Sequence, residues 1–448
     1  MSGIFGIDVN KDCWEEVKKG IGIIQSRGDE WGGFAAVQGN KIARESEKGK
    51  ITPFLEKERW KLKHPPQKVI AHVSQSSPQP ARIEETKMGP IAVAFDGKII
   101  NKEELKEKSP YLTGSDVGIM ARLIAAGKNP LEGLKNVYQN VKGPFSLELM
   151  TLDGIFAARD VLGIRPIIAG RFFGNEKIGC AIASESVSLE HIGMDLIRDI
   201  KPGEIAEIET SGFKTLEQVP SPGLIICGFE YGYWTRPSAI IESIWAGAVR
   251  RDAGKKLAPF CPQADIISSF PMSGNTAAEG LQQASGIPYQ SIFDFNIEAG
   301  GRSFLPADSE VRARRAKNKL LVMPWAVKGK KIVIVDDSIV EGNQTIARIS
   351  AIERAGAEEI HLMIETPPMK YPCPFDITCR GELMAANHTN EEMRKQLGVK
   401  SLMFNTVENI VDSIISNQSQ KRREENPVKI ENICLGCFTG EFPKYPNY

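Results

Sequence analysis

Two adjacent carboxylates end an apolar run in the second half of the chain, and a polar, glycine-containing loop follows them. The run is residues 332–335 (IVIV), the carboxylates are Asp336 and Asp337, and the loop meets a helical pattern at residues 342–345. Such a β-branched run predicts a buried parallel strand, and ligands of open α/β sheets bind just beyond the carboxyl ends of such strands. The two carboxylates suit ribose hydroxyls and Mg²⁺, while backbone amides at a helix N-terminus suit a phosphate. The alternative is an acidic strand end on a solvated loop.

The sequence VDDSIV followed by x-Gly, at residues 335–342, resembles the phosphoribosyl-diphosphate (PRPP) loop of type I phosphoribosyltransferases. Its form is similar to that of the glutamine PRPP amidotransferases, or amidophosphoribosyltransferases, of purine biosynthesis. That family usually has Arg-Gly-Thr-Thr where residues 341–344 of this chain read EGNQ. The threonine hydroxyls ordinarily help to hold the 5′-phosphate, and Glu341 adds a negative charge near a dianionic ligand. The resemblance implies a PRPP-binding set of Asp336, Asp337, Ser338, Gly342, Asn343, Gln344 and Thr345.

Three further segments extend this resemblance. Residues 271–274 (PMSG) stand where the family reads Pro-Asp-Ser-Gly, so Ser273 matches a metal-ligand hydroxyl. Residues 300–304 (GGRSF) resemble the flexible loop that closes over PRPP, with Arg302 as its anchoring cation. Lys319 falls at the family's Lys-Leu, which implies contact with the pyrophosphate; a solvated charge is the open alternative. The implied Mg²⁺ ligands are Ser273, Asp336 and Asp337.

The chain opens with a short apolar, glycine-spaced strand pattern after Ser2. Serine is small enough that removal of the initiator Met is expected, and Ser2 then carries a free α-amine. In N-terminal nucleophile (Ntn) hydrolases that amine is the base for its own side chain. Most of residues 2–210 resemble class II glutamine amidotransferases, which implies a four-layer αββα Ntn fold. The segments that carry this resemblance are residues 25–33 (QSRGDEWGG), 143–147 (GPFSL), 157–166 (AARDVLGIRP), 182–186 (IASES) and 198–204 (RDIKPGE).

The residues expected to hydrolyse glutamine depart from the family pattern at three places. The family begins Cys-Gly-Ile, and this chain has Ser2 at that nucleophile position, which is therefore interpreted as vestigial. Ser74 replaces the arginine that would clamp the substrate carboxylate. Asp96 replaces the oxyanion-site asparagine, and a carboxylate there would repel a developing oxyanion. Asp116 still matches the residue that recognises the substrate amine. Because such sites act as a unit, these losses together predict a lost glutaminase.

Two of the eight cysteines form a C-x₂-C pair near the C-terminus, Cys434 and Cys437. Such a pair is half of a metal site or a redox pair, and both zinc and an iron–sulfur cluster need two further ligands. The family resemblance supplies them at Cys227 and Cys373, which implies a [4Fe-4S] cluster and favours it over zinc. Cys379 is the nearest rival ligand. The remaining cysteines, Cys13, Cys180 and Cys261, are interpreted as small buried residues.

The elements that must position these residues belong to more than one domain, because 448 residues exceed one average domain. The expected fold class is α+β and α/β. It combines a class II glutamine amidotransferase-like αββα Ntn domain at residues 1–225, without glutaminase activity, and a type I phosphoribosyltransferase domain at residues 226–448 with a cluster-binding C-terminal segment. In the second domain, apolar runs alternating with helical patterns predict a parallel sheet with crossover helices. The runs are residues 225–226, 264–268, 291–295, 331–335 and 360–364, and the polar run 416–427 is expected to be a mobile surface connection.

Bulk composition excludes several classes of partner. Lys and Arg number 56, as do Asp and Glu, so there is no basic excess for nucleic acid or an anionic membrane. No apolar stretch is long enough to span a membrane, and no signal peptide pattern opens the chain. A cytoplasmic protein is therefore expected.

The function implied by the resemblance is amidophosphoribosyltransferase-like conversion of PRPP to 5-phosphoribosylamine in purine nucleotide biosynthesis. Since glutamine hydrolysis is predicted to be lost, ammonia is expected from solution or from a partner protein. The implied cofactors are a [4Fe-4S] cluster and Mg²⁺, and a homo-oligomer is expected. The alternative is a catalytically inactive paralogue that serves as an iron–sulfur binding regulator or scaffold. A phosphoribosyltransferase with another nucleophile is a third reading.

Overall fold

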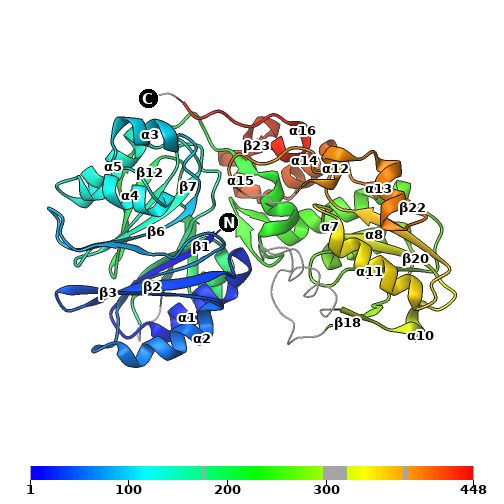
Figure 1. Cartoon of the computed structure of the whole chain (residues 1–448), viewed down its shortest axis with the longest axis horizontal. Coiled ribbons are helices and arrows are strands. Elements are labelled where there is room, and N and C mark those ends of the chain that lie inside the picture. Colours follow the sequence, from blue (N-terminus) through cyan, green and yellow to red (C-terminus); the bar gives the residue numbers. More distant parts are fainter. Residues whose placement is uncertain (1, 174–176, 296–319, 377–381, 447–448) are drawn as a thin grey trace.

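The computed structural model describes residues 2–173, 177–295, 320–376 and 382–446. Figure 1 shows two groups of layers side by side, with the strands and helices of the first half at the left and those of the second half at the right. Arg302 and Lys319 lie outside the described residues, as does Cys379.

Two antiparallel sheets stack face to face in the first half. An apolar layer between them includes Ile4, Ile70, Ala94 and Ile182. The first sheet has the order β11 (Asp195–Asp199), β9 (Ile168–Phe172), β10 (Gly179–Ala183), β1 (Ser2–Val9), β4 (Lys68–Ser74), β2 (Trp31–Gln38) and β3 (Lys41–Lys48). The second has the order β13 (Gly212–Gln218), β12 (Glu204–Glu209), β8 (Ile155–Arg159), β7 (Phe145–Met150), β6 (Ile91–Gly97) and β5 (Ala81–Ile83).

Helices cover the outer face of each sheet, and the result is the expected four-layer αββα arrangement. Because side chains alternate along a strand, Ile4 of β1 enters the layer between the sheets while Phe5 and Ile7 pack outward against helices. Helices α1 (Trp14–Ile23), α2 (Ile51–Glu58) and α6 (Ser186–Glu190) contribute to the core on the first sheet. Helices α3 (Lys102–Lys108), α4 (Asp116–Ala125) and α5 (Pro130–Asn140) contribute to the core on the second.

A four-stranded parallel sheet forms the centre of the second half. Its order is β17 (Ile266–Ser269), β20 (Lys331–Asp336), β21 (Glu359–Ile364) and β22 (Ser401–Phe404). The strands are buried on both faces, as expected for short runs of β-branched residues between crossover helices. The helices of this half are α7 (Ala246–Lys256), α8 (Asn275–Ser285), α10 (Pro324–Val327), α11 (Asn343–Arg354), α12 (Met384–Asn387), α13 (Asn390–Leu397), α14 (Val407–Ser416), α15 (Gln420–Glu425) and α16 (Gly436–Thr439).

Two of the five apolar runs predicted for this sheet lie elsewhere, so that part of the prediction is wrong. The run 225–226 leads into β14 (Ile226–Cys227), which pairs with β23 (Ile433–Cys434) in a separate two-stranded sheet. The run 291–295 contains β18 (Phe293–Phe295), which pairs antiparallel with β19 (Leu320–Val322). An apolar run predicts an extended, buried segment but carries no information about its partner strand.

The polar run 416–427 also differs from its prediction. It contains α15, and the Ser419 hydroxyl accepts a hydrogen bond from the Arg422 amide at 3.2 Å, as an N-cap residue does. The helix buries no side chain of its own, so its sequence lacks the apolar periodicity from which a helix is predicted.

The remaining short elements connect or cap the larger ones. They are β15 (Ile240–Ile241), β16 (Ile244–Trp245), the π-helical turn η3 (Glu230–Trp234), and the 3₁₀ turns η1 (Gln25–Arg27), η2 (Arg59–Lys61), η4 (Ala258–Phe260) and η6 (Ile430–Asn432). One apolar core runs from the second sheet of the sandwich to the cysteines, and includes Leu147, Tyr231 and Cys434. The two halves therefore share buried surface. The expected division at residues 225 and 226 stays a prediction.

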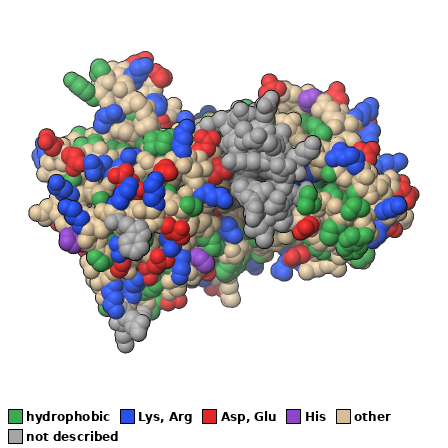
Figure 2. Space-filling view, turned by 60° about the horizontal axis from the view of Figure 1, so that its bottom comes forward, with side chains coloured by type: hydrophobic (Ala, Val, Ile, Leu, Met, Phe, Trp, Pro, Cys, Tyr) green, Lys and Arg blue, Asp and Glu red, His purple; other side chains and the backbone are tan. Residues whose placement is uncertain are grey.

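The surface carries both signs of charge. Lys and Arg side chains are interspersed with Asp and Glu over the face seen in Figure 2, and apolar side chains gather at its right-hand end. Leu321 of β19 and Trp325 of α10 are exposed. No helix in the described part of the chain is long and apolar enough to cross a lipid bilayer.

Candidate functional site

Asp336 ends β20, and Asp337 follows it at the carboxyl edge of the parallel sheet. Both side chains are buried. Ser273 donates a hydrogen bond from its hydroxyl to Asp336 Oδ1 at 2.9 Å, and Ser338 donates to Asp337 Oδ2 at 2.6 Å. Burial, and then the Asp337 carboxylate, raise the pKa of Asp336 well above its ordinary value. The negative charge of two neighbouring buried acids is stabilised most by a bound cation or by hydroxyl groups that donate hydrogen bonds to them.

The loop after the two acids turns into the N-terminus of α11. Gly342 has φ +80°, a backbone conformation that favours glycine, and a Cβ there would also displace the Met384 side chain, whose sulfur would lie 2.5 Å away. Asn343 begins the helix and is exposed, whereas Thr345 is buried. The first amides of a helix have no partner within it, so the implied phosphate end has backbone donors even without the threonines of the family.

The segment 271–274 lies against the same edge. The amide of Phe270 donates to the Val335 carbonyl at 3.0 Å, which joins the segment to the end of β20. Met272 has φ +74° and is largely exposed. A non-glycine residue in this left-handed region is strained, and such strain is concentrated at ligand sites. The structure thus brings together Ser273, Asp336, Asp337, Ser338 and residues 342–345 at one edge of the sheet.

Arg348 enters this site and was missed by the sequence prediction. Its Nη1 lies 3.9 Å from Asp336 Oδ2, its guanidinium stacks 4.7 Å from the centre of the Phe270 ring, and Gln344 Oε1 lies 3.4 Å from Nη2. The side chain is 14% exposed. Its place three residues after Thr345, on one helix face, was the available signal. Arg348 partly neutralises the acidic pair in the free protein.

In the first half, Asp96 occupies the place of the expected oxyanion donor and binds the start of β1. The Ser2 backbone nitrogen donates to Asp96 Oδ1 at 3.1 Å. Asp96 also lies 3.6 Å from Arg27 Nη2 and 3.9 Å from Arg165 Nη1, and all three side chains are fully buried. This carboxylate accepts hydrogen bonds and offers no donor. Asp96 is therefore part of a buried ionic network at the candidate glutaminase site.

Arg27 is the centre of that network. It donates to the Ser2 carbonyl at 3.1 Å, to Glu185 at 3.0 Å and to Glu230 at 2.7 Å. Burial opposes its charge, but the Glu230, Glu185 and Asp96 carboxylates outweigh burial and raise the pKa of Arg27. Glu230 opens η3 in the second half of the chain, so the network also links the two halves.

The other positions of the glutamine site have local partners. The Ser74 hydroxyl donates to the Ser77 carbonyl at 2.6 Å, and β4 passes so close to Gly28 that a Cβ on Gly28 would lie 2.4 Å from the Ser74 amide. Asp116 accepts from Lys102 at 2.9 Å and from the Ile99 amide at 3.1 Å. Asp116, which matches the amine-binding acid of the family, is thus already paired with a lysine.

The four predicted cluster cysteines lie near one another although they come from three separate segments of the chain. Cys227 and Cys434 are direct neighbours on the parallel strands β14 and β23, and the Cys437 carbonyl accepts from the Lys370 amide at 2.9 Å. Burial, and then the Cys434 thiol, raise the pKa of Cys227 and of Cys437; Cys373 acts on both in the same direction. Burial raises the pKa of Cys434 to about 11. In the described ranges, no three His, Cys, Asp or Glu side chains are arranged to hold a single metal ion.

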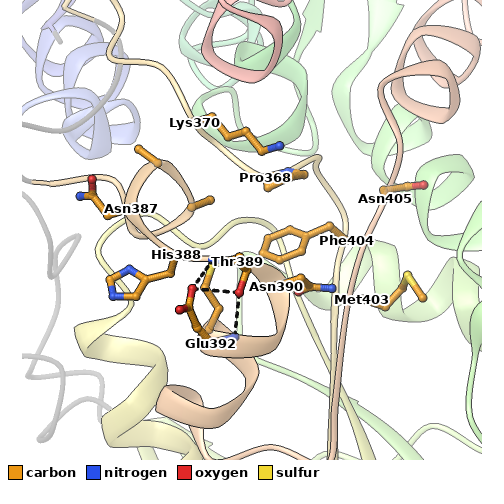
Figure 3. Close-up of a pocket in the computed structure, with 13 residues that line it drawn as sticks. Pro368, Lys370, Asn387, His388, Thr389, Asn390, Glu392, Met403, Phe404 and Asn405 are labelled. Atoms are coloured by element: carbon orange, nitrogen blue, oxygen red, sulfur yellow. Dashed lines mark hydrogen bonds between the residues drawn. The ribbon is translucent and has the colours of Figure 1, made fainter.

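An open groove of about 630 Å³ lies at the other side of the sheet's carboxyl edge, beyond β21 and β22 (Figure 3). Phe404 and Pro368 form an apolar part of the groove's wall, and Lys370 and His388 also line the groove. Glu392 accepts hydrogen bonds from the amide and hydroxyl of Thr389 at 2.8 Å, so its carboxylate caps its own helix, α13. The groove is separate from the site of Asp336 and Asp337.

The fold and the two sites define a class of protein: an Ntn-type glutamine amidotransferase domain joined to a type I phosphoribosyltransferase domain. A glutamine amidotransferase domain family matches residues 67–191. A solved structure of glutamine PRPP amidotransferase from Bacillus subtilis, in complex with ADP and GMP, superposes with a TM-score of 0.86 at 29% identity and covers 100% of this chain and 98% of its own.

Full-length relatives extend this match. The amidophosphoribosyltransferase of Bacillus subtilis is 31% identical and the match covers 98% of this chain and 94% of the relative. That of Methanothermobacter thermautotrophicus is 32% identical, with 98% and 93% covered. The chain belongs to the amidophosphoribosyltransferase family, which consists of pentosyltransferases of purine biosynthesis.

Proposed function

We propose that this protein converts PRPP and ammonia to 5-phosphoribosylamine and pyrophosphate. The observation that supports this proposal most is the buried pair Asp336 and Asp337 at the carboxyl edge of a parallel sheet, beside the N-terminus of α11. The pair suits ribose hydroxyls, and the helix amides suit the 5′-phosphate. The relatives named amidophosphoribosyltransferase support the same reaction.

Each retained residue then has a role in positioning the sugar. Asp336 and Asp337 accept hydrogen bonds from the ribose hydroxyls, and Ser338 orients the Asp337 carboxylate through its 2.6 Å hydrogen bond. Residues 342–345 hold the 5′-phosphate by backbone amides. Arg302 and Lys319, which lie outside the described residues, are proposed to neutralise the departing pyrophosphate. Fixing the anomeric carbon while charge develops on the leaving group is the main source of acceleration for such a transfer.

The residues around Asp336 also fit Mg²⁺. This ion is usually held by one or two carboxylates and by the substrate's phosphates, so it does not need a complete protein cage. Ser273, Asp336 and Asp337 would hold it, and it would supply positive charge to the pyrophosphate.

We infer that glutamine is not the nitrogen source. Glutamine hydrolysis needs a nucleophile, a carboxylate clamp and an oxyanion donor, and the matching positions carry Ser2, Ser74 and Asp96. Asp96 already accepts a hydrogen bond from the Ser2 backbone nitrogen and faces Arg27 and Arg165. A developing oxyanion there would meet a carboxylate, which disfavours the transition state. The first half is then a structural domain, and ammonia comes from solution or from a partner protein.

Pyrophosphate release tests these assignments directly. With PRPP and Mg²⁺, ammonium chloride is expected to support release, and glutamine at the same concentration is expected to give less than roughly one hundredth of that rate, since the whole glutaminase unit is altered. Equal rates with glutamine and ammonia would contradict the lost glutaminase. No release with either, together with no PRPP binding by calorimetry, would contradict the transferase.

The cysteines Cys227, Cys373, Cys434 and Cys437 are proposed to hold a [4Fe-4S] cluster. Four thiols from three segments of the chain, three of them buried, lie in one region, and each must lose its proton to bind metal. Protein purified without oxygen is expected to be brown and to contain about four irons and four sulfides per chain, as the cluster formula requires. Cys437→Ser should lower the iron content, whereas Cys261→Ser, at a half-buried cysteine remote from the set, should not. Zinc without iron in the wild type would contradict the cluster.

A second candidate function is favoured by Arg348. A guanidinium 3.9 Å from Asp336 competes for the carboxylate that a substrate needs, and this is the arrangement expected of an inactive paralogue that acts as a regulator or scaffold. The calorimetric experiment separates the two candidates, because an inactive paralogue that does not bind PRPP would give neither heat nor pyrophosphate.

A further inference from the structure

Glu365 is a buried carboxyl group that the proposed roles above do not use. It follows β21 directly and is 0% exposed. Neither of its carboxyl oxygens has a hydrogen-bond partner among the residues that the structure describes. Native proteins satisfy nearly all buried polar atoms, because an unpaired buried carboxylate is costly. A buried acid left with two vacant acceptor oxygens is therefore a candidate for binding a ligand.

The register of the sheet sets Glu365 beside the proposed ribose-binding pair. Asp336 of β20 is opposite Ile364 of β21, and the Glu365 amide donates to the Asp336 carbonyl at 2.9 Å. Because side chains alternate, Glu365 continues the face of Met363, and Asp337 continues the face of Val335. Met363 and Val335 share one apolar core, so Glu365 and Asp337 project to the same side of the sheet.

The charges around Glu365 favour a cation. Burial raises the pKa of Glu365 well above its ordinary value; Arg250 of α7 lowers it, and Asp337 and Asp336 raise it further. The Arg250 guanidinium donates to the Tyr231 carbonyl at 2.8 Å and to the Thr235 carbonyl at 2.7 Å. Among the described residues, the three acids Asp336, Asp337 and Glu365 outnumber the two cations that act on them, Arg250 and Arg348.

The size and chemistry of the ligand follow from this environment. A carboxyl group that is 0% exposed can be reached only by a small species, and two acceptor oxygens match N–H donors. An ammonium ion carries four N–H donors and the missing positive charge. We propose that Glu365 forms a binding site for ammonium, the nitrogen source, next to the ribose-binding acids. This inference rests on the proposed use of PRPP and ammonia. Ammonium bound there would stand one strand away from the sugar site. It would give one proton to the Glu365 carboxylate, and the NH3 that remains, with a free lone pair, would attack the anomeric carbon as pyrophosphate leaves.

Thermal unfolding tests ammonium binding without turnover. Ammonium chloride, compared with sodium chloride at equal ionic strength, is expected to raise the Tm of the wild type by about 1–2 °C at tenfold excess over Kd. Glu365→Gln keeps the shape and removes the charge, and should abolish the shift. The matched control Glu353→Gln, at an exposed acid of α11, should keep it. An equal shift with potassium chloride, or a shift that persists in Glu365→Gln, would overturn the proposal.

Turnover then separates this inference from the proposed function. Glu365→Gln is expected to raise the KM for ammonium roughly 10- to 100-fold with little change in KM for PRPP, which is the size of effect expected when a hydrogen bond to a charged group is lost. An unchanged ammonium KM would overturn the site while the transferase stands. If the wild type does not turn over PRPP, the transferase fails, and the ammonium-specific Tm shift still decides the site. Glu365→Ala serves the same purpose if the glutamine variant does not fold.

Discussion

Replacing Asp336 and Asp337 together by asparagine is expected to lower kcat/KM for PRPP by roughly 100- to 10,000-fold. Each carboxylate would lose a charge-assisted hydrogen bond to a ribose hydroxyl or a contact with Mg²⁺, and such bonds contribute about 1.5–3 kcal/mol each. Pyrophosphate release and calorimetric binding of PRPP measure the loss. Asp412→Asn, at an exposed acid of α14 that pairs with Lys256, is the matched control and should leave both values unchanged.

The stability of the same double variant is expected not to fall with its activity. Burial and the neighbouring acid raise the pKa of Asp336 in the folded protein. A carboxyl group whose pKa is raised by folding destabilises the fold at every pH above its ordinary pKa, so at pH 7 asparagine removes that cost. We expect an unchanged or higher Tm together with lost activity, as at functional sites that trade stability for chemistry. Lost activity with a much lower Tm would instead indicate a structural role.

Replacing Arg27 by methionine is expected to lower the free energy of unfolding by about 3–5 kcal/mol, because the change leaves buried carboxylates without their counter-ion. Arg27 is 0% exposed and faces Glu185, Glu230 and Asp96. Urea or thermal unfolding measures the loss. Lys57→Met removes an exposed ion pair with Glu47 and should leave the free energy of unfolding nearly unchanged.

A compensated variant makes the Arg27 prediction specific. The triple change Arg27→Met, Glu185→Gln and Glu230→Gln removes the excess charge along with the guanidinium, so it should recover much of the lost stability. The network also joins η3 to β1, and the single variant is expected to loosen the contact between the two halves. A cost below about 1 kcal/mol for Arg27→Met would show that water or other groups replace the guanidinium, and would contradict the network's role.

Much of the fold and of the phosphoribosyl site could be predicted from sequence because both depend on local patterns. A β-branched run ending in two acids predicts a buried strand with a site at its end, and β20 lies where that pattern predicts. A glycine-containing polar loop before a helical pattern predicts a helix N-terminus, and Gly342 directly precedes α11. The cysteine set depended on family resemblance, since the spacing of Cys434 and Cys437 alone left zinc and redox pairs open.

The runs 225–226 and 291–295 show where local patterns stop. Each became a strand, but β14 pairs with a strand from the C-terminal segment and β18 pairs with its own hairpin partner, outside the parallel sheet. Partner choice depends on packing between segments that are distant in sequence, and no pattern within either run reports it.

The amino-acid sequence by itself determined the family, the order of the two kinds of domain and the edge at which a phosphoribosyl ligand is expected. Only the tertiary structure decided what the departures from the family do. It made Asp96 a partner of the Ser2 backbone nitrogen and of Arg27, and it brought Arg348 to Asp336. It also set beside Asp337 a Glu365 carboxyl group that has no hydrogen-bond partner among the described residues. These relations arise from strand register and burial, which bring distant residues into one low-dielectric environment where each charge depends on its neighbours.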